Sequence, residues 1–346
     1  MELTLRINEV AFGGSGVGKA DGKVVFVPFT VDGELVQVRI TESHKSFSLG
    51  SLKTILQASP HREEPPCPYY QNCGGCDYQH VQYAHQLELK RLQVEQTLRR
   101  IAKLTEIVVP PVRPSPKIYG FRNRITVHSD GQAIGFFRKK SRQIVDIESC
   151  ALASDIVNTK LTKLRQQGLP PGSHATVRED GTIATFTQTN DEVAGKLLDY
   201  VRARLKGPIL VDAYCGSGFF AHRLAPACEA VIGIEWNRAA YNSAAQSAFT
   251  HEKYYCGDVA DLLPQVLRKN RVSTLLLDPP AEGLTKPVCE TIADYPPSTV
   301  IYISCNPATF ARDLDRLRPR FRLTEVQPFD MFPQTAEIEL AALLEP

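Results

Sequence analysis

Long hydrophobic runs are missing from this sequence of 346 residues. No stretch approaches the roughly 20 consecutive apolar residues that a membrane-spanning helix requires. The opening residues, Met1 to Thr4, lack the basic and then apolar pattern of a secretion signal. We therefore expect a cytoplasmic protein that makes no contact with a membrane. Internal repeats and low-complexity segments are missing too, and the length suggests two or three domains.

A strong net charge is also absent, since 40 basic side chains stand against 38 acidic ones. The global charge of +2 therefore does not indicate a polyanionic partner. One segment differs, because residues 111–143 hold a single acid, Asp130, and eight basic side chains. Such a block is usually a solvated face, but it can also bind a phosphate backbone. The eight are Arg113, Lys117, Arg122, Arg124, Arg138, Lys139, Lys140 and Arg142.

The nine cysteines are odd in number and unevenly spaced. In a reducing compartment this favours metal binding or catalysis over disulfides. Cys67, Cys73 and Cys76 follow a C-x5-C-x2-C pattern, and Cys150 lies 74 residues after the last of them. Four thiolates can hold either zinc or an iron–sulfur cluster, and the spacing does not decide between the two. We expect Cys215, Cys228, Cys256 and Cys289 to be packing residues.

The first 58 residues form short alternating segments separated by turns. The strands expected there are residues 3–7, 24–28 and 34–40, with a glycine-rich break at 13–16. Several short strands with glycine turns predict a small β-barrel, which includes the oligonucleotide-binding type. Any other small β module fits the pattern equally well.

Residues 59–190 are expected to form a central mixed β domain. A loop rich in cysteine and proline covers residues 60–80, and apolar residues at helical spacing predict a helix over 82–101. Strands are expected further on, for example at 124–128 and 182–186.

The remaining part, residues 191–346, alternates buried-type strands with helical runs. The strands expected are 209–212, 230–235, 274–278 and 300–304. Strands that alternate with helices predict a parallel, doubly wound sheet, so this domain is α/β and Rossmann-like.

A glycine turn follows the first of these strands, in the segment Asp212-Ala213-Tyr214-Cys215-Gly216-Ser217-Gly218. Glycines let the backbone pass close to a ligand, and ligands in such sheets bind beyond the carboxyl ends of the strands. Glu235 ends the next strand, where a carboxylate can accept hydrogen bonds from both hydroxyls of a ribose. The turn is shorter than the dinucleotide fingerprint, and no phosphate-binding lysine follows. It favours a nucleoside without a pyrophosphate, such as S-adenosylmethionine, over a turn that serves packing alone.

Two further strand ends carry chemically active side chains. Asp278-Pro279-Pro280 is similar to a motif that binds amino groups in methyltransferases, but Ala281 stands where that motif has an aromatic residue. Cys305 follows the last strand, and Asn306-Pro307 indicates an exposed turn there rather than a core strand. A lone cysteine is more often a buried, inert thiol.

A thiolate at this place has a chemical use. Uracil C5 is a poor nucleophile towards a methylsulfonium, and addition of a thiolate to C6 makes C5 nucleophilic. The thiol must be deprotonated for this, and a base must later remove the C5 proton. Glu339 is the candidate base, and the alternative is a solvent-facing residue of an alternating strand.

Taken together, these motifs resemble those of the RNA uracil-5-methyltransferase family, which acts on transfer RNA and 23S ribosomal RNA. The likeness covers nearly the whole chain. Residues 2–57 resemble the RNA-binding TRAM domain, and 212–216 resemble the first cofactor motif. Ser304-Cys305-Asn306-Pro307 is similar to the nucleophile signature, and residues 330–335 resemble the segment before the base.

The resemblance implies a role for each candidate residue. Cys305 is the nucleophile and Glu339 the general base. Five residues would contact the methyl donor: Gln188, Tyr214, Glu235 at the ribose, Asp258 near the adenine, and Asp278 between donor and uracil. The segment Phe121-Arg122-Asn123-Arg124 would contact the substrate, and a loop of RNA is expected because the uracil must leave its stack. The family also implies a monomer without an obligate protein partner.

Residues 73–80 are similar to segments of members that carry a [4Fe-4S] cluster. The likeness therefore assigns Cys67, Cys73, Cys76 and Cys150 to such a cluster, with zinc as the alternative. Its role would be structural or RNA-positioning, because the methyl transfer needs no electron transfer.

Three positions depart from the family pattern. Members usually have arginine where Ala281 stands and histidine where Glu337 stands, and some have asparagine at Phe219. Two other functions therefore stay open: amino methylation through Asp278-Pro279-Pro280, and RNA binding without chemistry.

Overall fold

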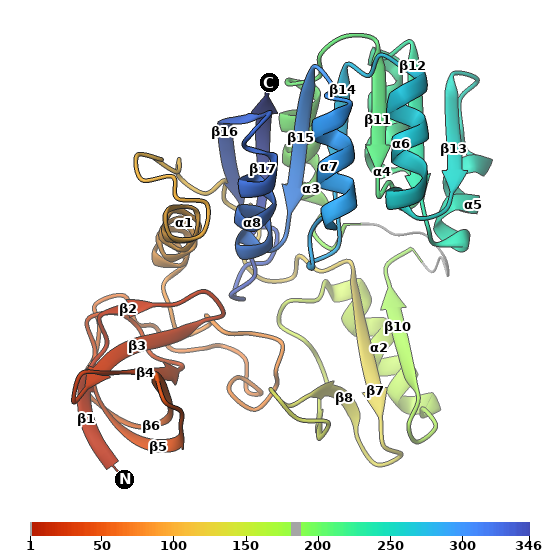
Figure 1. The fold of residues 1–346 in the computed structure, drawn as a ribbon. Coiled ribbons are helices and arrows are strands. Elements are labelled where there is room, and N and C mark those ends of the chain that lie inside the picture. Colours follow the sequence, from red (N-terminus) through yellow and green to blue (C-terminus); the bar gives the residue numbers. More distant parts are fainter. Residues whose placement is uncertain (1, 181–187) are drawn as a thin grey trace. The chain divides into compact units, whose positions relative to one another are not determined.

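The computed structural model describes residues 2–180 and 188–346 (Figure 1). The chain forms two compact units, and each is built from three separate pieces of sequence. The first unit consists of Met1–Gln93, Pro116–Gly181 and Phe332–Glu337. The second consists of Val94–Ser115, Thr182–Met331 and Ile338–Pro346. The expected barrel and most of the expected central region both fall in the first unit.

A six-stranded sheet forms the N-terminal part of the first unit, in the order β1-β5-β6-β4-β3-β2. Its strands are β1 (Glu2–Arg6), β2 (Glu9–Val10), β3 (Ser15–Ala20), β4 (Lys23–Pro28), β5 (Leu35–Ser43) and β6 (Phe47–Gln57). The pairs are antiparallel except β4 with β6, which is parallel. Alternate residues such as Ile7, Val27 and Val38 are fully buried and form its core. The three expected strands are confirmed as β1, β4 and β5, and β2, β3 and β6 are additions.

The first unit also holds a four-stranded antiparallel sheet in the order β10-β7-β8-β9. Its elements are β7 (Arg124–Ser129), β8 (Ile134–Phe137), β9 (Ile144–Asp146), β10 (His174–Arg178) and the helix α2 (Asp155–Gln167). Val157 and Leu161 of α2 pack against Ile125, Val127 and Val177 of the strands. The expected strand at 182–186 lies outside the described residues.

The helix α1 (Tyr83–Arg100) follows the cysteine-rich loop, where a helix was expected. Val94 and Leu98 on its second half are fully buried in the core of the second unit. No helix in the described ranges is long and apolar enough to cross a membrane.

The second unit contains a seven-stranded sheet in the order β13-β12-β11-β14-β15-β17-β16. Its strands are β11 (Ile209–Ala213), β12 (Ala230–Glu235), β13 (Glu252–Cys256), β14 (Thr274–Leu277), β15 (Thr299–Ser304), β16 (Arg322–Phe329) and β17 (Glu339–Glu345). The first five run parallel, which confirms the Rossmann-like prediction. Three strands were not predicted from the sequence: β13, which is parallel to β12, and β17 and β16, which are antiparallel.

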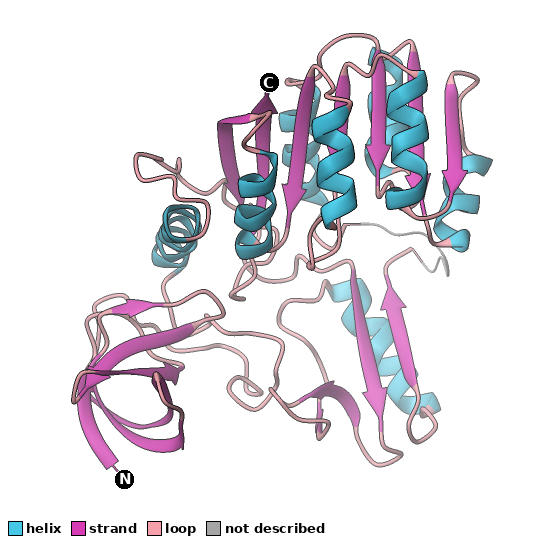
Figure 2. Cartoon of the chain, viewed as in Figure 1, coloured by secondary structure: helices cyan, strands magenta, loops and turns pink. Residues whose placement is uncertain are grey.

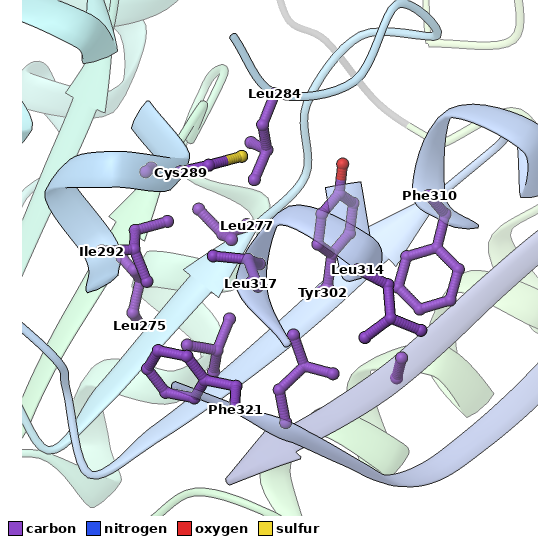
Figure 3. Packing of buried hydrophobic residues seen from close by; sticks show 14 of the residues in the cluster. Leu275, Leu277, Leu284, Cys289, Ile292, Tyr302, Phe310, Leu314, Leu317 and Phe321 are labelled. Atoms are coloured by element: carbon purple, nitrogen blue, oxygen red, sulfur yellow. The ribbon is translucent and has the colours of Figure 1, made fainter. Parts of the chain in front are cut away.

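Helices cover this sheet: α3 (Asp191–Arg202), α4 (Phe219–Leu224), α5 (Arg238–Gln246), α6 (Val259–Lys269), α7 (Lys286–Asp294) and α8 (Pro307–Leu317), with a 3-10 turn at Ala225–Ala227. Figure 3 shows how residues of β14, β15, α7 and α8 fill the space between them. The rings of Tyr302 and Phe310 meet edge to face, with centroids 5.1 Å apart. Buried Asp313 of α8 accepts hydrogen bonds from the Tyr302 hydroxyl and the Leu284 N–H, at 2.9 and 2.7 Å. This core anchors the loops that follow β14 and β15.

Candidate functional site

The glycine turn after β11 has the backbone shape that the sequence suggested. Tyr214 has a φ of 68°, which is rare for a residue with a side chain, and such strain is typical of ligand sites. The N–H groups of Tyr214 and Cys215 both donate to the carbonyl of Ile234 on β12, at 3.0 Å. Gly218, with a φ of 83°, caps the start of α4. The turn is therefore held against the end of the neighbouring strand.

Glu235, at the end of β12, is 7% exposed, and its carboxylate is held by backbone donors. The Gly216 N–H donates to Oε2 at 2.9 Å, and the Asn237 N–H donates to Oε1 at 2.7 Å. A carboxylate that accepts these two hydrogen bonds still has free lone pairs. They can accept hydrogen bonds from further donors, such as the hydroxyls of a ribose. The next residue, Trp236, is 72% exposed.

Asp258 and Gln188 are the other residues expected at the methyl donor. Asp258 is exposed and caps α6, where its carboxylate accepts a hydrogen bond from the Ala260 N–H at 2.8 Å. Gln188 is half-buried, and the residues directly before it, 181–187, lie outside the described residues.

Two further carboxyl groups belong to the ends of β11 and β14. Burial raises the pKa of Asp212 well above its usual range, and the nearby charge of Asp278 adds to the effect. Burial also raises the pKa of Asp278. The Oδ2 atom of Asp212 accepts a hydrogen bond from the Ala221 N–H at 3.0 Å.

The candidate nucleophile and base lie at the ends of adjacent strands. β15 and β17 pair antiparallel, and the last pair of the register is Ser304 with Leu340. Cys305 directly follows the end of β15, and Glu339 is the first residue of β17. Cys305 is half-buried and Glu339 is 7% exposed, whereas Glu337 is exposed. The sequence could not predict that the strands beside these two residues are neighbours, because Cys305 and Glu339 are 34 positions apart.

Two hydrogen bonds to one backbone carbonyl connect the loop that bears Cys305 with the loop that contains Asp278. The Asn306 side-chain amide and the Thr309 hydroxyl both donate to the Ala281 carbonyl, at 3.3 and 2.9 Å. Asn306 also caps α8, since its side-chain oxygen accepts from the Ala308 N–H at 3.0 Å. These positioning residues were missed, although an asparagine followed by proline at a helix start is a recognisable capping signal.

The remaining cysteines of this unit differ in exposure. Cys215 and Cys289 are buried, as expected for packing residues, and burial raises the pKa of both thiols. Cys228 and Cys256 are half-buried.

The first unit brings the four clustered cysteines to one cavity of about 50 Å³. Cys67, Cys73, Cys76 and Cys150 line it together with Arg122. Burial raises the pKa of Cys73, of Cys150 and, to about 12, of Cys76. No disulfide joins these cysteines, and the buried Nε of Arg122 has no hydrogen-bond partner among the described residues.

Cys150 is held by Asn158 of α2. The Cys150 N–H donates to the Asn158 side-chain oxygen at 2.8 Å, and the side-chain amide donates back to the Cys150 carbonyl at 3.1 Å. Across residues 2–180 and 188–346, no three histidine, cysteine or acidic side chains converge closely enough to hold a single metal ion. Ligands of a multi-iron cluster need not converge in this way, since each binds a different iron.

A groove of about 790 Å³ lies beside the six-stranded sheet in the same unit. Phe26 and Phe29 line it, as do the basic side chains of Lys53, Lys139 and Lys140. The Lys139 ammonium lies 6.0 Å from the centre of the Phe29 ring and forms an ion pair with Asp77. Aromatic rings beside cationic groups are typical of surfaces that bind nucleic acid.

Comparison with known proteins identifies the chain. Residues 258–346 match the family described as tRNA (uracil-5-)-methyltransferase, and residues 1–53 match the TRAM domain. An RNA methyltransferase of Bdellovibrio bacteriovorus is 31% identical over 99% of this chain and 95% of its own length. The tRNA (uracil(54)-C(5))-methyltransferase of Schizosaccharomyces pombe is 26% identical over 98% of this chain and 77% of its own.

Among solved structures, the Pyrococcus abyssi tRNA (uracil-54, C5)-methyltransferase in complex with S-adenosyl-L-homocysteine has the same fold. The TM-score is 0.75 at 24% identity, over 99% of this chain and 100% of the other.

These matches define an S-adenosylmethionine-dependent RNA methyltransferase. The chain belongs to the RNA uracil-5-methyltransferase family. The resemblance predicted from its motifs is confirmed.

Proposed function

We propose that this enzyme methylates C5 of a uridine in structured RNA, either transfer RNA or 23S ribosomal RNA, through a covalent bond between Cys305 and C6. The position of Cys305 directly after β15 and of Glu339 at the start of β17, the strand that pairs with β15, carries the proposal. A nucleophile and a base on adjacent strand ends can act on neighbouring atoms of one ring.

The Cys305 thiolate attacks C6, and the electron pair of the C5–C6 double bond moves towards C5 and O4. C5 then takes the methyl group of the donor, whose sulfonium becomes a neutral thioether. Glu339 removes the proton from C5, which restores the C5–C6 double bond and expels the thiolate. The uracil thus exchanges a proton for a methyl group, and Cys305 is regenerated.

The methyl donor is bound, in this proposal, by residues at the carboxyl ends of the parallel strands. Tyr214 and Gln188 contact it, Glu235 accepts from its ribose, Asp258 lies near the adenine, and Asp278 lies between donor and uracil. The fixed carboxylate of Glu235 and the raised pKa of the buried Asp278 support this assignment. A cationic donor favours the ionised form of Asp278.

RNA containing 5-fluorouridine tests the mechanism. Fluorine cannot leave C5 as a proton, so the protein and S-adenosylmethionine should form a stable covalent complex with the RNA on a denaturing gel. Cys305→Ala should form none, whereas Cys289→Ala should still form it, because Cys289 is a buried core thiol. Separate transfer RNA and ribosomal RNA samples identify the substrate.

Other outcomes would point to other functions. Full activity of Cys305→Ala would favour amino methylation at Asp278-Pro279-Pro280. RNA binding without methyl transfer to any cellular RNA would favour a binding factor.

We also propose that Cys67, Cys73, Cys76 and Cys150 hold a [4Fe-4S] cluster. The cavity that all four line and the unpartnered Arg122 Nε support a bound anionic group. When bound, the cluster supplies a structural cross-link between the loop and Cys150.

Metal analysis tests this assignment. Protein purified without oxygen should be brown and contain about four irons per chain. Cys76→Ala should lose the colour, and Cys228→Ala should keep it. One zinc per chain and no iron would contradict the proposal.

We expect the enzyme to act as a monomer in the cytoplasm. The groove beside Phe26, Phe29 and Lys53 is proposed to hold part of the RNA, since its charge and rings suit a polyanion with bases.

A further inference from the structure

A buried carboxylate joins three elements of the second unit, α4, α5 and β13. Glu252 is the first residue of β13, the edge strand of the sheet, and α5 lies beside this strand (Figure 2). The Glu252 side chain is fully buried. Its Oε2 atom lies 2.6 Å from Nδ1 of His222 on α4 and accepts a hydrogen bond from the Tyr254 hydroxyl at 3.0 Å. The Nε2 atom of His222 lies 3.0 Å from the hydroxyl of Ser247, which ends α5.

The hydrogen bonds around Glu252 have defined directions. Two donors meet at Oε2, as expected of an ionised carboxylate, which can only accept, so His222 carries a proton on Nδ1. Burial, and after it the charge of Glu252, raise the pKa of Tyr254, so its hydroxyl keeps its proton as well. Replacing such a buried pair by apolar side chains is often neutral or even stabilising. Folding alone therefore does not require this acid and this histidine.

The His222 ring packs directly against the end of the glycine turn after β11. A helical side chain leans towards the start of its helix, and His222 stands four residues after Gly218. A Cβ atom on Gly218 would lie 2.6 Å from both Nε2 and Cδ2 of the His222 ring. Because Gly218 has no Cβ, its backbone rests on the ring, and the position of the ring supports the turn.

Tyr254 makes a corresponding contact with β12. A Cβ atom on Gly233 would lie 2.3 Å from the Tyr254 ring and 3.0 Å from Sγ of Cys215. Gly233 stands two residues before Glu235, the proposed ribose ligand. Glu252 thus holds two rings, one under the glycine turn and one beside the end of β12. These are two of the segments to which the proposed function assigns the methyl donor.

We propose that Glu252 and His222 are positioning residues for S-adenosylmethionine, because they hold the glycine turn in the shape that binds the donor. Glu252 fixes the His222 ring, and the ring fixes the backbone at Gly218. A turn that is held ready need not be ordered when the ligand binds, which raises affinity. The inference rests on the proposed function for the place of the donor, and it adds residues that determine how tightly the donor is held.

Two variants of Glu252 test this role in calorimetric titrations with S-adenosylhomocysteine, without RNA. Glu252→Leu removes the acceptor and should raise the Kd about tenfold, because binding must then order the turn. Glu252→Gln removes the charge but keeps an acceptor for His222 and Tyr254, so its Kd should stay within about twofold of the wild type. Equal affinities in the wild type and Glu252→Leu would overturn the proposal.

His251→Leu is the matched control for these titrations. His251 belongs to the same unit, but its ring stacks on Phe249 and its Nε2 lies 3.1 Å from the Ala225 carbonyl. Its loss should leave the Kd unchanged. A Kd raised as much as in Glu252→Leu would show that any lost histidine contact has this effect, and would overturn the proposal.

Two further measurements separate positioning from stability. In Glu252→Leu the KM for S-adenosylmethionine should rise about tenfold, while kcat at saturating donor stays within about twofold of the wild type. Glu252→Leu combined with His222→Leu removes both partners, so its Tm should return towards that of the wild type while the Kd stays raised. Recovery of affinity together with Tm would mean that the pair serves stability alone.

These outcomes can be told apart from those of the uracil chemistry. Failure of the 5-fluorouridine trap with a raised Kd in Glu252→Leu would reject the Cys305 mechanism and keep the positioning role. A working trap with wild-type affinity in Glu252→Leu would do the reverse. Absence of S-adenosylhomocysteine binding by the wild type would reject both.

Discussion

At the scale of single residues, two glutamates near the C-terminus have opposite environments. Glu339 is 7% exposed at the start of β17, whereas Glu337 is exposed. A general base acts best where it can approach the proton without competing water. The buried residue is therefore the better candidate, although the exposed one occupies the place where family members have histidine.

Glu339→Gln should lower kcat by about 10²- to 10⁴-fold, the usual contribution of a general base. Methyl transfer should still occur, so the methylated uracil should remain bonded to Cys305. A protein–RNA band on a denaturing gel, with ordinary RNA and S-adenosylmethionine, measures this. Glu337→Gln is the control: this variant should release methylated RNA and form no protein–RNA band. Equal behaviour of the two variants would exclude Glu339 as the base.

Trp236 is the single tryptophan of the chain, and it directly follows the proposed ribose ligand Glu235. Its 72% exposure should fall when a nucleoside binds beside it. We expect a change of intrinsic fluorescence that saturates with S-adenosylhomocysteine, and a raised KM for S-adenosylmethionine in Trp236→Leu. Glu235→Gln should shift the titration to higher concentrations. A fluorescence change that saturates with added RNA, and not with S-adenosylhomocysteine, would contradict this prediction and place Trp236 near the RNA substrate.

Asp212 makes stability depend on pH. Its folded pKa is raised by burial, so the folded state binds more protons than the unfolded one above about pH 4. Stability is therefore lost as pH rises through this window. Asp212→Asn removes the effect, so its melting temperature should exceed that of the wild type at pH 8 and lose the advantage near pH 4. Asp261→Asn, an exposed change on α6, should show no such trend.

At the scale of elements, the loops after β14 and β15 behave as one piece because they share the Ala281 carbonyl. Thr309→Val removes one of the two donors at nearly constant volume. We expect a loss of about 1 kcal/mol in stability and slower trapping of 5-fluorouridine RNA, because the Cys305 loop is less well held.

Ser154→Ala is a suitable comparison for this variant. Ser154 caps α2 in the first unit, so its loss should cost a similar free energy of unfolding. The trapping rate should not change in that variant. Equal slowing in both would mean that the effect comes from general stability alone.

Local sequence patterns were enough to predict most elements but not their partners. The apolar runs of β11, β12 and β15 identify buried parallel strands, and the spacing in α1 identifies a helix. β17 lies between β15 and β16 in the sheet, so its role in the site depends on pairing across the sheet. For the same reason Cys305 and Glu339 could be named singly, while the pairing of the strands beside them could not.

The cysteine cluster shows the same limit. Three of the cysteines are close in sequence, so the sequence was enough to predict that they lie together. Cys150 joins them through the chain path between β9 and α2, where Asn158 holds its backbone.

At the scale of the whole molecule, the chain leaves and re-enters each unit. Phe332–Glu337 belongs to the first unit, although it lies between two strands of the second. Both Asp77 and Tyr78 donate backbone hydrogen bonds to the Gln334 carbonyl at 3.0 Å. Ala336 is buried with apolar residues of the first unit such as Val10 and Leu89. A segment near the C-terminus thus completes the core of the N-terminal unit.

Ala336→Arg should therefore destabilise the first unit, because it forces a charge into that apolar cluster. We expect a loss of more than about 2 kcal/mol, seen as faster hydrogen exchange in residues 2–93. Glu337→Arg changes the adjacent, exposed residue and should leave the exchange unaltered. Faster exchange confined to the second unit would contradict this assignment.

The interleaved pieces also set an order for synthesis. A ribosome makes the barrel first, but the first unit receives its last piece only after Cys305 and its strand have been made. A prematurely ended chain then lacks both Glu339, the proposed general base, and the segment that completes the first unit. Such a product should be removed by proteolysis instead of occupying RNA that it has no means to methylate.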